Sequence, residues 1–366
     1  MPKSAIQTVR EELISALLLR AGVNPVPAFG SAVAEAAERR YGPTGCDLRA
    51  VAREISAISG IPDPGNTEGR IEAAFSTTFG TSVFDGVVNT VMAAPFRSGR
   101  DTSAGWVHER EVTNFSPNRR VREQQGDALA QLPRGGSSEH MHRRFSDAEE
   151  YRVHRFSRQF VVDSQDLVND DVDALAEPVR VLAAAAIQTK LDLIYSALLE
   201  NAALADGIAL FHANHQNLDA AAALAQTTLD DAIASTQKQV ENGAVLDLES
   251  RYLIVPPELR GTARRLARGV ELAAADGNLI VRSEPRLSIG VTDPVTGTQY
   301  TGSPTSWYLA VAADAGPTIE FGYIDTPRPR LTSWELGEGQ YGKGFAVKWD
   351  IGAKPTGFQG LRRADA

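Results

Sequence analysis

The chain has almost no cysteine, no long apolar run and no segment with the pattern of a signal peptide. Its 366 residues include one cysteine, Cys46, so no disulfide can form within the chain and synthesis in a reducing compartment is expected. No apolar run approaches the ~18 residues of a membrane span. The segment 1–22 carries Glu11 and Glu12 inside an amphipathic pattern and lacks the apolar centre of a signal peptide. We therefore expect a soluble protein without a membrane partner, made in cytoplasm.

The short motifs of common enzyme classes are also missing. There is no G-x-S-x-G, no H-E-x-x-H and no cysteine–histidine pair at a known spacing. The segment 337–344, GEGQYGKG, approaches a phosphate-binding loop, but a strand pattern follows it where such a loop needs a helix. His212 and His215 could be two metal ligands, but a third is not visible. We expect no enzyme, cofactor or metal; the alternative from another class is a metal-dependent hydrolase using the two histidines.

Charge is distributed unevenly along the chain. The net charge is −9 at pH 7, which disfavours a general attraction to nucleic acid. The segment 119–158 is nevertheless rich in arginine and has no lysine. Such a segment is often an ordinary solvated surface. Guanidinium, however, favours planar and fixed carboxylate partners, so we interpret the segment as a contact surface between proteins.

One long helix is expected at 178–201, where alanine and leucine dominate. Pro178 suits its first turn, because a proline lacks the N–H that has no partner there. An apolar stripe marks its buried face, and aspartates before it can cap and charge its start. The stripe consists of Ile187, Leu191, Ile194 and Leu198, and the aspartates are Asp170, Asp171 and Asp173.

The rest of the chain predicts an α+β architecture without a regular βαβ series, built on an antiparallel sheet. Two β-prone runs, 106–112 and 152–162, flank the polar segment 119–150, which indicates a projecting hairpin arm. The Gly- and Pro-rich linker 60–65 is the clearest domain boundary. Helices are expected at 5–20, 31–39, 47–59, 83–94, 228–242 and 259–275, and further strands at 251–255, 279–283, 307–312, 319–324, 330–336 and 345–351.

Several segments in a fixed order resemble the major capsid protein of tailed bacteriophages, which has the Hong Kong 97-like fold. The branch that the chain most resembles is described as fusions of prohead protease and major capsid protein. The resemblance covers roughly residues 70–360, and an ordered set of segments is more specific than any one of them. The matching segments are RQFVVDSQDLVNDD (158–171), LDLIYSAL (191–198), DGIALFHANHQNL (206–218), RYLIVPPEL (251–259), EPRL (284–287) and WYLA (307–310).

The resemblance implies a division of the chain. The long helix would be the spine of a peripheral domain, and the arm an extended loop over a neighbouring subunit. The first 65 residues lack a Ser/His constellation, so they are interpreted as a scaffolding-like or ordered extension and not as the protease. The expected segments are an N-terminal helical extension (1–65), an N-arm (66–118), the extended loop and its strands (119–165), the peripheral domain (166–225), an axial domain (226–335) and a return to the peripheral domain (336–366).

The implied function is that of a shell subunit in the virion. Copies would assemble as hexamers and pentamers into an icosahedral head that encloses double-stranded DNA without sequence-specific binding. Scaffolding, portal or decoration proteins are possible partners, and an encapsulin-like compartment is a variant with the same fold. The residues expected at subunit contacts are Arg134, Arg143, Arg144 and Arg152 in the arm and Asp170, Asp171, Asp173 and Glu177 at the helix start.

Some members of the fold join subunits by an isopeptide bond from a lysine on the extended loop. That chemistry needs an amine nucleophile, which a guanidinium cannot supply because it stays protonated. No lysine occurs from Ser4 through Thr189, so the arm lacks the required group. We therefore expect a shell without covalent cross-links from the loop.

Overall fold

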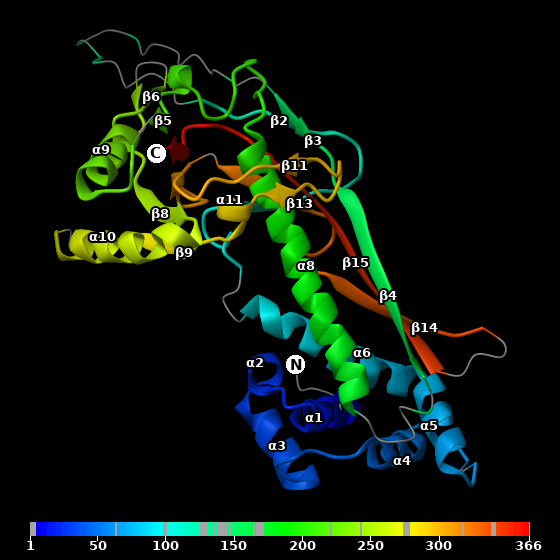
Figure 1. Cartoon of the computed structure of the whole chain (residues 1–366). Helices are drawn as coiled ribbons and strands as arrows, with labels where there is room; N and C mark the ends of the chain where they lie inside the picture. The colour runs from blue at the N-terminus through cyan, green and yellow to red at the C-terminus, as the bar shows by residue number, and fades with distance from the viewer. Residues whose placement is uncertain are drawn as a thin grey trace. The chain divides into compact units, whose positions relative to one another are not determined.

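The computed structural model divides the chain into two compact units (Figure 1). Unit 1 comprises Met1–Arg100, Arg155–Ile187 and Arg328–Trp349, and unit 2 comprises Asp101–His154, Gln188–Pro327 and Asp350–Ala366. The structure describes residues 5–62, 64–97, 101–124, 131–132, 134, 137, 145, 148–163, 165, 172–219, 222–241, 244–273, 279–316, 318–337 and 342–365.

Unit 1 begins with helices, close to the predicted positions. Asp47 caps α4, its side chain accepting a hydrogen bond from the backbone N–H of Ala50 at 2.6 Å. Gly60, with φ of 67°, ends the same helix in the left-handed conformation. The helix expected at 83–94 is longer than predicted, and a further helix precedes it. The helices are α1 (Ala5–Arg20), α2 (Val26–Phe29), α3 (Ser31–Tyr41), α4 (Leu48–Ser59), α5 (Thr67–Ser76) and α6 (Thr78–Arg97).

The N-terminal helices share one hydrophobic core with later parts of unit 1. Leu17 of α1, Ile55 of α4 and Val87 of α6 are buried in it. Val179 of the long helix and Phe345 of a C-terminal strand belong to the same cluster. Helices on both sides of the 60–65 linker therefore pack together, and the first 60 residues are integral to the unit.

The long helix α8 spans Val172–Glu200, 29 residues, or about 43 Å at 1.5 Å per residue. It begins six residues earlier than predicted, so Pro178 lies inside the helix and not in its first turn. Interior proline costs a helix about 3 kcal/mol. Burial of Ala176 and Val179 in the core of unit 1 opposes that cost. The predicted apolar stripe is confirmed, because Ile187, Leu191, Ile194 and Leu198 are all buried.

The segment Ala176–Glu200 of α8 is, contrary to expectation, long and apolar enough to cross a membrane by length and composition. However, 56% of its most apolar window is buried inside the protein. Such burial is typical of the core helix of a soluble protein, so this helix gives only weak evidence for a membrane span.

A first sheet contains five strands and is mixed. In unit 2, β1 (His108–Glu111) pairs in parallel with β13 (Ile319–Tyr323), and β13 pairs antiparallel with the C-terminal half of β15 (Gly342–Pro355). In unit 1, β14 (Arg330–Glu335) pairs antiparallel with the N-terminal half of β15, with Glu335 opposite Lys343. β4 (His154–Asp163) also pairs with β15. The glycine-rich segment 337–344 therefore joins two strands, which is not the strand-to-helix setting of a phosphate loop.

A second sheet, with the order β5-β16-β12-β8-β9, forms the body of unit 2. Its β8 and β9 are parallel and joined through α10, a βαβ crossover. The predicted α+β class holds, but this sheet is mixed and not antiparallel throughout, because a helix between two strands permits parallel pairing. The elements are β5 (Leu218–Asp219), α9 (Gln226–Gln237), β8 (Ser250–Val255), α10 (Arg260–Ala273), β9 (Ile280–Ser283), β12 (Trp307–Val311) and β16 (Leu361–Ala364).

Both α9 and α10 cover the same face of this sheet. Leu229 of α9 and Ala263 of α10 share a hydrophobic cluster with Leu253, Trp307 and Leu309 of the strands. α9 ends five residues before the predicted position 242, and a short hairpin follows it. The remaining elements are β2 (Asn118–Arg120), β3 (Glu149–Tyr151), η1 (Ala213–His215), β6 (Val240–Glu241), β7 (Ala244–Val245), η2 (Pro257–Leu259), α11 (Arg286–Ile289), β10 (Val291–Thr292) and β11 (Gln299–Tyr300).

Candidate functional site

The base of the predicted arm is a pair of short antiparallel strands, β2 and β3, with Asn118 opposite Tyr151 and Arg120 opposite Glu149. Glu123 and Phe145 form an isolated bridge further along. The hairpin is therefore confirmed at its base. The predicted runs at 106–112 and 152–162 do not pair with each other. Strand β1, within the first run, pairs with β13, and β4, which covers most of the second, pairs with β15.

A buried carboxylate on β13 holds both strands of this base. Glu320 is 4% exposed, and its Oε1 accepts hydrogen bonds from Arg120 Nε and from the Tyr151 hydroxyl, each at 2.6 Å. Burial and the neighbouring Glu320 carboxylate raise the pKa of Tyr151, so the phenol stays a donor. Removal of Glu320 would leave a half-buried guanidinium without its partner.

Two further carboxylates hold the segments that lead into and out of the arm. Arg122 forms a bidentate pair with Glu241, at 3.0 and 2.5 Å, and Glu241 also accepts a hydrogen bond from Gln359 at 2.9 Å. On the other strand, Glu149 accepts from the backbone N–H of Ala205 at 2.5 Å and lies 3.3 Å from Lys354 Nζ. We name these contacts and the Glu320 cluster the arm anchor.

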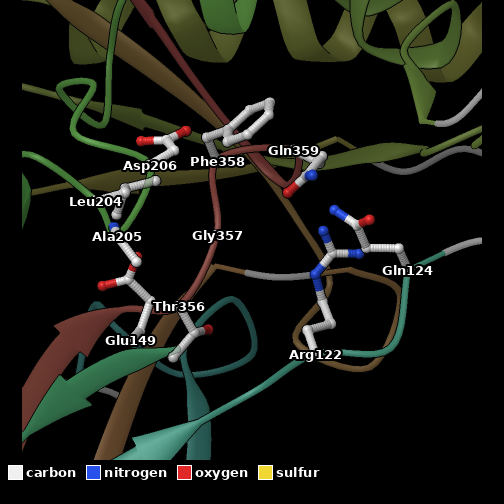
Figure 2. A pocket seen from close by; sticks show the side chains of 10 residues that line it. All are labelled: Arg122, Gln124, Glu149, Leu204, Ala205, Asp206, Thr356, Gly357, Phe358 and Gln359. Atoms are coloured by element: carbon white, nitrogen blue, oxygen red, sulfur yellow. The ribbon is translucent and has the colours of Figure 1, made fainter. Parts of the chain in front are cut away.

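A small pocket of about 110 Å³ lies at the arm anchor (Figure 2). Arg122 and Gln124 extend into it from the segment after β2, and Asp206 and Phe358 come from two loops of unit 2. Its charged groups Arg122, Glu149 and Asp206 are already paired with side chains outside the pocket lining, Glu241, Lys354 and His215. No cluster of three metal-ligating side chains occurs in the part of the chain that the structure describes. The pocket has the features of a polar joint at the base of an arm.

The two histidines considered as metal ligands make other contacts. His215 is buried, its ring stacks on Phe358 at 3.9 Å, and its nitrogens lie 3.1 Å from the Leu210 carbonyl and 2.9 Å from Asp206 Oδ2. Burial alone would raise the pKa of Asp206, but hydrogen bonds from Ile208 and His215 lower it. His212 Nδ1 accepts from a backbone N–H in its own turn. Both rings serve to fold this loop.

A buried ion pair on α8 was not singled out from the sequence. Lys190 is 3% exposed and donates to Asp101 at 2.7 Å and to Glu109 at 2.6 Å, with its ammonium 5.0 Å from the ring centre of Phe321. Burial alone would raise the pKa of Asp101, but Lys190 and the Ser103 hydrogen bonds lower it. The helical period could have indicated that this lysine is buried, because Lys190 lies four residues before Ile194 and so on the same face as the apolar stripe.

A second buried cluster explains one of the segments that carried the resemblance. Within 284–287, Glu284 is 1% exposed and pairs with Arg286 at 2.8 Å. Arg286 also reaches Asp192 of α8 at 2.5 Å, and Thr102 donates to Glu284 at 2.5 Å. Burial alone would lower the pKa of Arg286, but its two carboxylate partners raise it. This segment therefore joins α8 to the second sheet within unit 2.

The predicted contact residues are only partly covered by the structure. Arg134 and Arg152 are exposed, and Glu177 is exposed and lies 3.2 Å from Arg180 of its own helix. Asp173 falls within α8 and not before it. Arg143, Arg144, Asp170 and Asp171 lie outside the described residues. The contact between the two groups stays a prediction.

Comparison with protein families matches residues 147–364, more than half of the chain, to a model described as phage capsid protein. The chain belongs to the phage capsid protein family. Among solved structures, the capsid of Staphylococcus phage Andhra is similar with a TM-score of 0.50 at 8% identity, over 72% of this chain and 84% of the other. This similarity shows the fold and confirms the expected Hong Kong 97-like architecture. No curated protein matches.

Two other solved structures are similar at lower scores. The mature capsid of bacteriophage PhiM1 is 13% identical over 72% of this chain and 86% of that one, with a TM-score of 0.47. An encapsulin complex from Synechococcus elongatus is 10% identical over 71% and 84%, with a TM-score of 0.41. The capsid protein described here is a major capsid protein, a virion component whose copies associate with one another to form a shell.

Proposed function

We propose that this capsid protein forms an icosahedral lattice of hexamers and pentamers around double-stranded DNA, without sequence-specific binding and without catalytic activity. The arm anchor is the observation that supports this most directly. Three buried carboxylates on separate elements hold the two strands of one hairpin base, so the arm extends from a rigid base. A rigid foundation suits a segment whose tip binds another subunit, because less freedom is lost on binding.

The chain is made in the host cytoplasm in this proposal, and its six segments have the roles given above. Scaffolding, portal or decoration proteins would join the shell during assembly. An encapsulin-like compartment is the alternative within the same fold, and a cargo protein in place of DNA would mark it. A hydrolase using His212 and His215 is disfavoured by the contacts that both rings make within their loop.

Electron microscopy of the purified full-length protein tests the lattice. Closed shells of uniform diameter are expected, and nuclease-protected DNA is expected in particles taken from infected or induced cells. Persistently monomeric protein under all assembly conditions would overturn the proposal. Protein-filled particles without DNA would favour the compartment.

The arm contact is the second part of the proposal. We expect Arg143 and Arg144 to bind a neighbour's acidic helix start around Asp170, Asp171, Asp173 and Glu177. An exposed pair contributes only about 0–1 kcal/mol, but the lattice repeats it.

Reversing both arginines to glutamate should give a folded subunit that assembles poorly. The control applies the same change to Arg39 and Arg53, exposed on α3 and α4. Normal shells from the arm variant would contradict the contact.

A further inference from the structure

Helix α10 carries a row of exposed arginines. Arg260, Arg264 and Arg268 follow at intervals of four residues, so they lie on one face about 6 Å apart along the axis. Arg265 is exposed beside them and donates to Thr262 at 3.1 Å. None of these four has a carboxylate partner within the described ranges. In a chain of net charge −9, this is a local surplus of positive charge.

The arginine row lies beside the face of α10 that packs on its own sheet. Ala263 and Ala267 of α10 are buried in the cluster that includes Leu253 and Val255 of β8. The arginines project from the flank of the helix beside this buried face, where they are exposed to solvent or to another molecule. Four long side chains held out on a regular helix form a prearranged binding surface.

The neighbouring part of the same layer carries the opposite charge. Asp230 and Asp231 are exposed on α9, and Asp247 and Glu249 are exposed after the β6–β7 hairpin. We name these four residues the acidic side. In the hairpin between them, Val240 lies opposite Val245, and the two are 58% and 62% exposed. Together the two valines give this charged surface a small apolar contact area.

The two charged regions lie at different positions over the sheet. α10 packs against β9, the edge strand, and against β8. α9 packs against β8, and the Ala222 carbonyl just before it accepts a hydrogen bond from Trp307 of β12, a central strand. One unit therefore presents a basic helix over the sheet edge and an acidic helix over the sheet interior.

We propose that the arginine row of α10 docks on the acidic side of a second copy of this chain, in a head-to-tail contact. This rests on the proposed lattice, because a closed ring of identical copies needs two different, complementary faces on each copy. Guanidinium–carboxylate pairs are often bidentate and so fix orientation as well as attraction. Val240 and Val245, in the hairpin between the residues of the acidic side, supply the apolar part of the contact.

Duplex DNA is a different partner for an arginine row, and the structure favours it less. A phosphate backbone laid across the layer would approach the exposed carboxylates of α9, which lie on the same face of the same sheet. Repulsion there would oppose the attraction to α10. A second copy can place its own carboxylates on the arginines and avoid that cost.

The test uses charge reversal and restoration in the full-length protein. Arg264→Glu with Arg268→Glu should raise the protein concentration needed for assembly on the order of tenfold, because about two pairs per contact become repulsive. Asp230→Arg with Asp231→Arg should do the same. All four substitutions in one chain should restore assembly, since the charges are then exchanged and again complementary. Light scattering and electron microscopy give the readout, and circular dichroism confirms folding.

Three outcomes overturn the docking. The first is normal assembly of both double variants. The second is failure of the variant with all four substitutions to recover assembly to the level of the Arg39→Glu, Arg53→Glu control. The third is normal assembly of the arginine variant combined with lost binding to a fluorescent duplex DNA, which would assign the row to phosphate.

A second readout separates this contact from the lattice itself. Arg264→Cys and Asp230→Cys chains, mixed with a bifunctional maleimide, should give a cross-linked dimer that neither chain gives alone; Cys46 is buried. Absence of that dimer overturns the docking even where shells form. Absence of shells from the unmodified protein overturns the proposed function, even where the dimer is seen.

Discussion

Replacing Lys190 by methionine tests how unit 2 tolerates a charge in its interior. The ammonium is 4% exposed at the side chain and lies between Asp101, 13% exposed, and Glu109, 44% exposed. Methionine retains the length and apolar contacts of the chain near Phe321 but removes the charge and both hydrogen bonds. Asp101 is then left buried without a counter-ion.

The expected loss is about 3 kcal/mol in the free energy of unfolding. Breaking a buried ion pair by removing one partner costs about 3–5 kcal/mol. The Glu109 pair adds little, about 0–1 kcal/mol, because water reaches that carboxylate. Asp101 also keeps its hydrogen bonds from Ser103 N–H at 2.9 Å and from the Ser103 hydroxyl at 2.5 Å. The expected loss of stability therefore lies at the lower end of the range for a broken buried pair. Adding Asp101→Asn should recover about 1 kcal/mol, since the stranded charge is removed.

The effect should depend on pH in a definite direction. The pKa of Asp101 lies below its ordinary value of 3.8, because Lys190 and Ser103 outweigh the effect of burial. Its stabilising contribution is therefore complete above pH 3.8 and is lost as pH falls through the lower folded pKa. In the methionine variant burial dominates and the pKa rises. The difference between the two proteins should be largest near neutral pH and should shrink at acid pH.

Urea unfolding of the unassembled subunit, followed by circular dichroism from pH 3 to pH 8, measures this. Lys238→Met is the matched control, because Lys238 is exposed at the end of α9. The control should change stability by less than about 0.5 kcal/mol. Equal stability of the Lys190 variant and its parent at pH 7, or a difference that grows on acidification, would refute the reasoning.

Three further outcomes are expected. Leu191→Ala should lower the free energy of unfolding by about 2–5 kcal/mol, because Leu191 is 4% exposed and a cavity would form; unchanged thermal unfolding would show that the site collapses freely. Leu17→Ala should cost a similar amount while Ile58→Ala, 40% exposed, costs little, and equal effects would argue against a shared core for the N-terminal helices. Boiled particles should migrate as single chains near 39.3 kDa on a denaturing gel, and a ladder with cross-linked peptides from the arm would contradict the absence of loop cross-links.

Local pattern was enough for most individual elements. The helix predicted at 5–20 matches α1 end to end, and the strand predicted at 307–312 ends one residue beyond β12. Side-chain period and capping are properties of neighbouring residues, so they are visible in a single sequence. Pro178 shows the limit of local signals. It marks a first turn by propensity, but the core of unit 1 extends the helix past it.

The sequence by itself determined the type of most of the longer elements, the buried face of α8, and, through several ordered segments, the capsid family. Only the tertiary structure decided which strands are parallel and which charges meet. Arg120 and Glu320 are separated by 200 positions, and Arg122 and Glu241 by 119. The chain has many arginines and carboxylates of equal affinity, so no local rule selects these pairs. The packing of whole elements selects them, because it fixes which side chains lose water together.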